Sequence, residues 1–106
     1  MLYFLLGENR DCIAVDAKEW LAWYKNTESE NCDVAEDFLL DREVRISTMF
    51  TGLSWEVSPK EPPKPFLTIV FVGYGIDEQY RYSTWDQALI GHKKTVAKLK
   101  SDFGLQ

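Results

Sequence analysis

Hydrophobic and polar residues alternate most clearly in the middle of the chain. From residue 44 to residue 53 the side chains follow the period of two that is typical of a β-strand. We therefore expect one face of this strand to lie in the core and the other to be half exposed to water. The expected core face holds Val44, Ile46, Thr48 and Phe50, and the opposite face holds Arg45, Ser47, Met49 and Thr51.

Residues 66–72 are apolar on both faces, which predicts a strand at the centre of a sheet. We expect helices to cover one of these faces. The other face needs a cover as well, either from the N-terminal hairpin and the proline-rich segment or from a second subunit. One face would hold Phe66, Val70 and Val72, and the other Leu67, Ile69 and Phe71.

The N-terminal part of the chain predicts a hairpin followed by a helix. Apolar runs at residues 2–6 and 12–15 flank a polar turn. Asp16 with Glu19 three residues later matches a capping box, so we expect a helix over residues 16–25. Residues 34–40 alternate weakly and predict another strand, which a polar turn at residues 41–43 joins to the strand that follows.

Segment 59–65 contains four prolines and is expected to be an extended crossing, because proline lacks an N–H donor and fixes φ. Its spacing also allows a PxxP ligand for an aromatic groove. Residues 79–82 predict a short edge strand. Ser83 with Asp86 matches a second capping box, and an apolar stripe predicts a helix over residues 84–100. Gly91 within that helix suggests the close approach of another backbone.

These elements predict a single α+β domain over residues 1–106. We expect an antiparallel sheet of about four to six strands packed against two helices. The expected core holds Trp20, Leu21, Tyr24, Ile46, Phe50, Ile69, Phe71, Trp85, Leu89, Val96 and Leu99.

The formal net charge of −5 argues against nonspecific binding to nucleic acid, which needs clustered Lys and Arg. We expect the basic residues near the C-terminus to lie on the solvated face and at the C-terminal end of a helix, and the alternative is that they form an anion-binding patch. No apolar run approaches the ~20 residues of a membrane helix, and no signal peptide is evident. We expect Cys12 and Cys32 to be free thiols in a reducing cytoplasm. The basic residues are Lys93, Lys94, Lys98 and Lys100.

His92 is the single histidine and falls on the apolar stripe of the last helix. Three interpretations stay open: a hydrogen-bonded core histidine, a contact or ligand-binding residue, and a general base. No Cys or second His is placed to complete a metal site. We therefore expect no catalytic residue, no metal and no cofactor.

Other candidates for binding are aromatic and acidic. Trp55 follows an expected strand, where either the neighbouring prolines cover it or it serves as a contact anchor. Asp37 and Asp41 belong to an acidic stretch that suits a solvated sheet edge or a patch for a basic partner. Tyr74 lies between two glycines in a turn that leads into no helix, which excludes a dinucleotide loop. The predicted binding residues are Trp55, His92, Asp37, Asp41 and Tyr74.

Three motifs carry a resemblance. RISTMFTGL at residues 45–53, FLTIVF at 66–71 and RYSTW at 81–85 are followed by Ala88, Gly91 and His92. In this order they resemble small uncharacterised proteins encoded by tailed bacteriophages and prophages. The resemblance implies a setting in the cytoplasm of a bacterial host cell and implies no activity. Family members often carry Asp-His where this chain has Ser54 and Trp55, and a Glu where it has Leu67.

We therefore expect a phage accessory protein that acts by binding and not as an enzyme. Its partner would be a host protein, a defence protein or a small ligand. One alternative is a homodimeric structural or assembly module. The other is a nucleotide-binding protein or small enzyme that uses His92 with Lys93 and Lys94.

Overall fold

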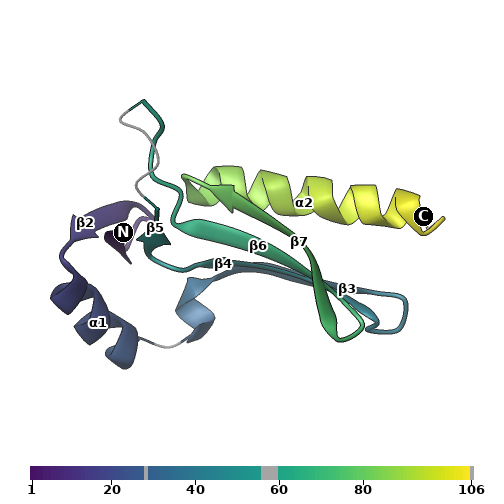
Figure 1. Ribbon diagram of the computed structural model, residues 1–106, viewed down its shortest axis with the longest axis horizontal. Coiled ribbons are helices and arrows are strands. Elements are labelled where there is room, and N and C mark those ends of the chain that lie inside the picture. The colour runs from purple at the N-terminus through teal and green to yellow at the C-terminus, as the bar shows by residue number, and fades with distance from the viewer. Residues whose placement is uncertain (28, 56–59, 106) are drawn as a thin grey trace.

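The computed structural model describes residues 1–27, 29–55 and 60–105. It confirms the predicted α+β class, with two helices and two antiparallel sheets (Figure 1). The small sheet has the order β2-β1-β5, and the main sheet has the order β3-β4-β6-β7. In chain order the elements are β1 (Leu2–Leu6), β2 (Cys12–Val15), α1 (Ala17–Asn26), a 3-10 turn (Ser29–Cys32), β3 (Asp33–Leu39), β4 (Val44–Phe50), β5 (Leu53–Ser54), β6 (Phe66–Val72), β7 (Gly75–Tyr82) and α2 (Trp85–Asp102).

The strand expected over residues 44–53 is two strands, and this prediction was wrong at Thr51 and Gly52. Both of these residues donate their backbone N–H to the carbonyl of Pro65, at 2.8 and 3.3 Å, so they leave the strand ladder. Gly52 has a φ of 72°, and a Cβ there would lie 2.5 Å from the Phe4 carbonyl oxygen. The glycine therefore lets the chain turn and carries β5 into the small sheet.

Helix α2 covers one face of the main sheet and contacts all four of its strands (Figure 1). The β4 side chains that the period of two assigned to the core are buried, and they pair in register with side chains of β6. Within the described residues, neither helix covers the opposite face. Ile69 and Phe71, which we expected in the core, lie on that open face and are half-buried.

Two clusters of buried side chains make the core. Edge-on aromatic contacts link Phe66 to Phe50 on one side and to Trp85 on the other, with ring centroids 5.1 and 6.2 Å apart. Each fully buried side chain of this size stabilises the fold by about 1.5–3 kcal/mol. One cluster holds Leu39, Val44, Ile46, Val70 and Leu99; the other holds Phe4, Phe50, Phe66 and Ala88.

Helix α1 lies against β1 and has no fully buried residue. Leu21 and Tyr24 are exposed, so their expected place in the core was wrong. Trp20 and Trp23 make the inward contacts of α1 instead: the Trp20 ring contacts Tyr3 of β1 and the Trp23 ring contacts Phe50 of β4.

The two helix starts differ in how well the capping rule located them. Asp16 accepts from the Glu19 N–H at 2.8 Å, which confirms the first cap. The second capping box was wrong by one residue: Thr84, not Ser83, accepts from the Gln87 N–H, at 3.1 Å. Gln87 Oε1 in turn accepts from the Ser83 N–H at 3.2 Å. Two adjacent hydroxyl residues made the sequence signal ambiguous.

Candidate functional site

His92 is buried between α2 and the main sheet, with only 2% of its surface exposed. Its Nε2 lies 2.7 Å from Oδ2 of Asp37 on β3, and its Nδ1 lies 2.7 Å from Oγ1 of Thr48 on β4. Thr48 Oγ1 lies 2.5 Å from Oγ1 of Thr68, its cross-strand partner on β6. We call these four residues the buried polar chain.

The donors and acceptors of the buried polar chain fix its direction. The Asp37 carboxylate can only accept, so His92 Nε2 carries a hydrogen. With a neutral ring, Thr68 donates to Thr48, Thr48 donates to His92 Nδ1, and every hydrogen has a partner. A charged ring would reverse the two hydroxyl bonds and leave the Thr68 hydrogen buried without an acceptor. The neutral ring with a hydrogen on Nε2 therefore satisfies the chain.

The order carboxylate, histidine, hydroxyl is also that of a catalytic triad. Here the hydroxyl belongs to Thr48, which is completely buried, and its partner Thr68 is completely buried as well. A nucleophile must reach a substrate carbonyl, and this one faces the interior of a packed sheet. The buried polar chain is therefore part of the packed core, and only the Asp37 side chain at its end is exposed to water.

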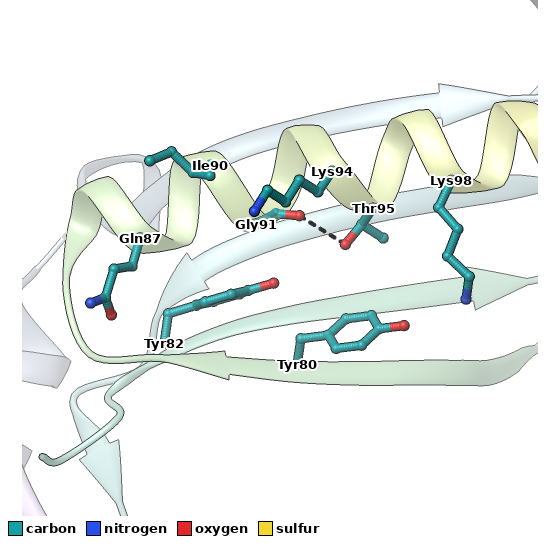
Figure 2. A pocket seen from close by; sticks show the side chains of 8 residues that line it. All are labelled: Tyr80, Tyr82, Gln87, Ile90, Gly91, Lys94, Thr95 and Lys98. Atoms are coloured by element: carbon teal, nitrogen blue, oxygen red, sulfur yellow. Dashed lines mark hydrogen bonds between the residues drawn. The ribbon is translucent and has the colours of Figure 1, made fainter. Parts of the chain in front are cut away.

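A groove of about 470 Å³ lies between β7 and α2 (Figure 2). Gly91 shapes it, because a Cβ there would lie 2.2 Å from the Tyr82 ring. The close approach expected at Gly91 is therefore to a side chain, not to a backbone. We call this the α2 groove. Its lining residues are Tyr80, Tyr82, Gln87, Ile90, Gly91, Lys94, Thr95 and Lys98.

One end of the α2 groove is electrostatically paired. Glu78 accepts a hydrogen bond from the Tyr80 hydroxyl at 2.5 Å and one from Lys98 Nζ at 2.9 Å. These two bonds lower the pKa of Glu78, the Tyr80 bond most, and the carboxylate raises the pKa of both Tyr80 and Lys98. Lys94, one helical turn away, has no acidic partner within the described residues.

A third feature lies where the two hairpin turns of the main sheet meet (Figure 1). The Gly73 N–H donates to the Glu43 carbonyl at 2.9 Å, which ties the β3–β4 turn to the β6–β7 turn. Large apolar side chains are exposed on and beside these turns, and Tyr74 is exposed completely. We call them the hairpin-tip surface: Phe38, Leu40, Val72, Tyr74 and Ile76.

The β3–β4 turn holds an uncommon backbone. Leu40, Asp41 and Arg42 all have positive φ, at 50°, 51° and 71°. The Glu43 N–H donates to the Leu40 carbonyl at 3.1 Å and closes the turn. Left-handed backbone costs a residue with a side chain of the order of 1 kcal/mol or more, and such strain concentrates at functional sites.

The five predicted binding residues do not form one site. Asp41 and Tyr74 lie on the two joined hairpin turns, whereas Asp37 and His92 belong to the buried polar chain. Trp55 follows β5 and is 62% exposed, beyond the opposite end of β4. Because Asp37 holds His92, replacing it would disturb the core and would not be a clean test of binding.

The two cysteines and the possible metal ligands are the remaining candidates for chemistry. Cys12 and Cys32 are free thiols, and partial burial raises the pKa of both. Among residues 1–27, 29–55 and 60–105, no group of three His, Cys, Asp or Glu could hold a metal ion. In the same ranges, neither helix is long and apolar enough to cross a membrane.

No protein-family model matches the chain, and neither a curated protein nor a solved structure is similar to it.

Proposed function

We propose that this protein acts by binding another protein through its hairpin-tip surface. The observation that carries the proposal is the exposure of large apolar side chains on and beside two hydrogen-bonded turns. Leu40 and Tyr74 lie on the turns, Phe38 and Ile76 lie on one face of the strands that lead into them, and Val72 lies on the other face. Single exposed apolar residues are ordinary, but several at one place are typical of a contact surface.

The chemistry of this surface suits a protein partner. Tyrosine is enriched at the energetic centres of interfaces, because its ring buries a large area and loses little rotamer freedom. Burying Tyr74 and Ile76 would contribute about 1.5–3 kcal/mol each. Arg42 lies over the Phe38 ring, with the guanidinium carbon 4.7 Å from the ring centre, which adds a charged rim.

The closed turn favours tight contact. A loop that is already ordered loses little conformational freedom when it binds. The hydrogen bond between Gly73 and Glu43 and the bond across Leu40 and Glu43 both support this order. The strain in Leu40, Asp41 and Arg42 is then the cost of presenting the surface in one shape.

The sequence resemblance to phage proteins suggests the setting. We propose that the partner is a host or defence protein of a bacterial cell. A role for His92 in catalysis has less support, because its two ring nitrogens are both bonded within a buried chain. A homodimer formed through the same surface is the main competing arrangement.

The test compares two matched double variants. Tyr74→Ser with Ile76→Ser alters the hairpin-tip surface, whereas Ile13→Ser with Leu21→Ser alters exposed apolar residues of β2 and α1. Tagged protein is incubated with bacterial lysate, and captured proteins are quantified by mass spectrometry. We expect a partner that the wild type and the β2/α1 variant capture, and that the tip variant loses by at least tenfold.

Two outcomes would contradict the proposal. One is equal capture by the tip variant, and the other is no specific capture by the wild type at native abundance. Sedimentation equilibrium at micromolar concentration separates the competing arrangement. A wild-type dimer that the tip variant converts to a monomer would assign the surface to a second copy of the chain.

A further inference from the structure

A free sheet edge borders the α2 groove. β7 pairs with β6 on one side, and within the described residues no strand pairs with its other side. An unpaired edge presents a row of backbone N–H and C=O groups to any extended chain. Helix α2 runs alongside this edge, and the lining side chains of both elements face the same space (Figure 2).

The repeat of α2 matches the repeat of an added strand. Ile90, Lys94 and Lys98 succeed one another every four residues, which is about 6 Å along a helix. Alternate residues of a strand are about 6.6 Å apart and point to the same face. A chain paired with β7 would therefore present successive inward side chains to successive turns of α2.

The successive turns of helix α2 present different chemistry to the groove. Ile90 and the Tyr82 ring make one end of the groove apolar. Lys94 at the next turn has no acidic partner in the described part of the chain. Lys98 already binds Glu78. An incoming carboxylate would thus be attracted to Lys94 and repelled by Glu78.

We propose that the β7 edge and the α2 groove together bind an extended acidic peptide segment, which adds to the main sheet as a fifth strand. An apolar side chain of this segment lies against Ile90 and Tyr82. A carboxylate two residues away pairs with Lys94. The α2 groove shares no lining residue with the hairpin-tip surface, and neither proposal depends on the other.

A second copy of the chain suits this edge poorly. Pairing two β7 edges about a two-fold axis would bring the two lysine-bearing α2 helices towards each other. Like charges that face each other across an interface are unfavourable. The groove is therefore better matched to an acidic segment than to itself.

The experiment uses the isotope-labelled full chain and short synthetic peptides, followed by amide chemical shifts. The probe peptides are strand-forming and carry Val and Glu two residues apart, in either order. We expect saturable shifts along β7 and along α2 from Gln87 to Lys98. Lys94→Glu should weaken the binding by roughly tenfold, since it turns an attractive exposed pair into a repulsive one. Lys93→Glu, the same change at an exposed neighbour outside the groove, should leave the binding unchanged.

Three further probes separate recognition of a strand from recognition of an anion. A peptide with N-methylated backbone amides keeps both side chains but cannot donate to the edge, and it should not bind. Free glutamate and inorganic phosphate should cause no saturable shifts along β7. Binding by any of these three probes, equal losses in the two lysine variants, or shifts that avoid β7 would each overturn the proposal.

Discussion

The interior of the main sheet and its hairpin tips reverse the usual distribution of side chains. The interior encloses polar residues, among them Thr48, Thr68 and His92, where apolar packing is the norm. The tips expose Tyr74 and Ile76, where polar turn residues are the norm.

The difference between the two regions lies in whether the chain itself supplies the partners. Each of these three side chains is hydrogen-bonded within the fold, so it needs nothing from outside. The apolar tips have no such cover. A partner gains free energy by covering exposed apolar surface, and for this reason we propose the tips, and not the histidine, as the binding site.

Removing His92 should have the largest effect on stability. His92→Ala leaves a cavity and deprives Thr48 of its acceptor, so we expect a loss of about 3–5 kcal/mol in the free energy of unfolding. That is a large part of the roughly 5–15 kcal/mol of a typical domain. Urea denaturation followed by tryptophan fluorescence measures it. Lys93→Ala, at the exposed neighbouring position, should change the free energy by no more than about 0.5 kcal/mol. Similar values for the two variants would show that the buried polar chain contributes little.

The elements of the fold were largely predictable from the sequence, but their limits were less so. The alternation in β4 and the apolar run in β6 identified both strands, and the alternation identified the core face of β4. The apolar run did not identify the core face of β6, because both of its faces are apolar. The sequence did not predict that β4 ends before Thr51. This end depends on the hydrogen bond from the Thr51 N–H to the Pro65 carbonyl, and only folding brings these two residues together.

The candidate sites were less predictable, because they depend on contacts between distant residues. Asp37 and His92 are 55 positions apart, and no spacing rule joins them. Thr48 on a predicted core face was the available signal, since a buried hydroxyl needs a partner. The α2 groove and the joined turns likewise form only when the fold brings distant segments together. The sequence analysis named Tyr74 and Asp41 as candidate binding residues, but it did not predict that their turns meet.

The direction of the buried polar chain can be tested with two isosteric replacements. Thr48→Val removes the donor to His92 Nδ1 and also the acceptor of Thr68, so it should destabilise by about 1–3 kcal/mol. Thr68→Val removes only the donor to Thr48 and should be milder, at about 1 kcal/mol. Both free energies come from the same denaturant titrations. A Thr68→Val loss as large as that of Thr48→Val would indicate the reversed chain with a charged ring, because Thr48 would then donate to Thr68 and lose its acceptor.

Relieving the strained turn should have a smaller effect of the opposite sign. Asp41→Gly permits the observed φ of 51° without a side-chain clash, so we expect a gain of about 0.5–1 kcal/mol in the free energy of unfolding. The unfolded chain also gains freedom with glycine, which limits the gain. Thermal unfolding measures this gain. The control is Asp11→Gly in the turn between β1 and β2, since Asp11 has no positive φ. Equal changes in both variants would mean that the turn stores no strain.

The smallest effect on stability is expected where the largest effect on binding is proposed. Tyr74→Ser with Ile76→Ser removes exposed apolar surface that contacts little of the folded chain, so the free energy of unfolding should change by no more than about 0.5 kcal/mol. Solubility should rise, because the exposed apolar area falls. A loss of several kcal/mol would show that the tips stabilise the fold itself. The contrast with His92→Ala would then disappear, and with it the reason for assigning the tips to a partner.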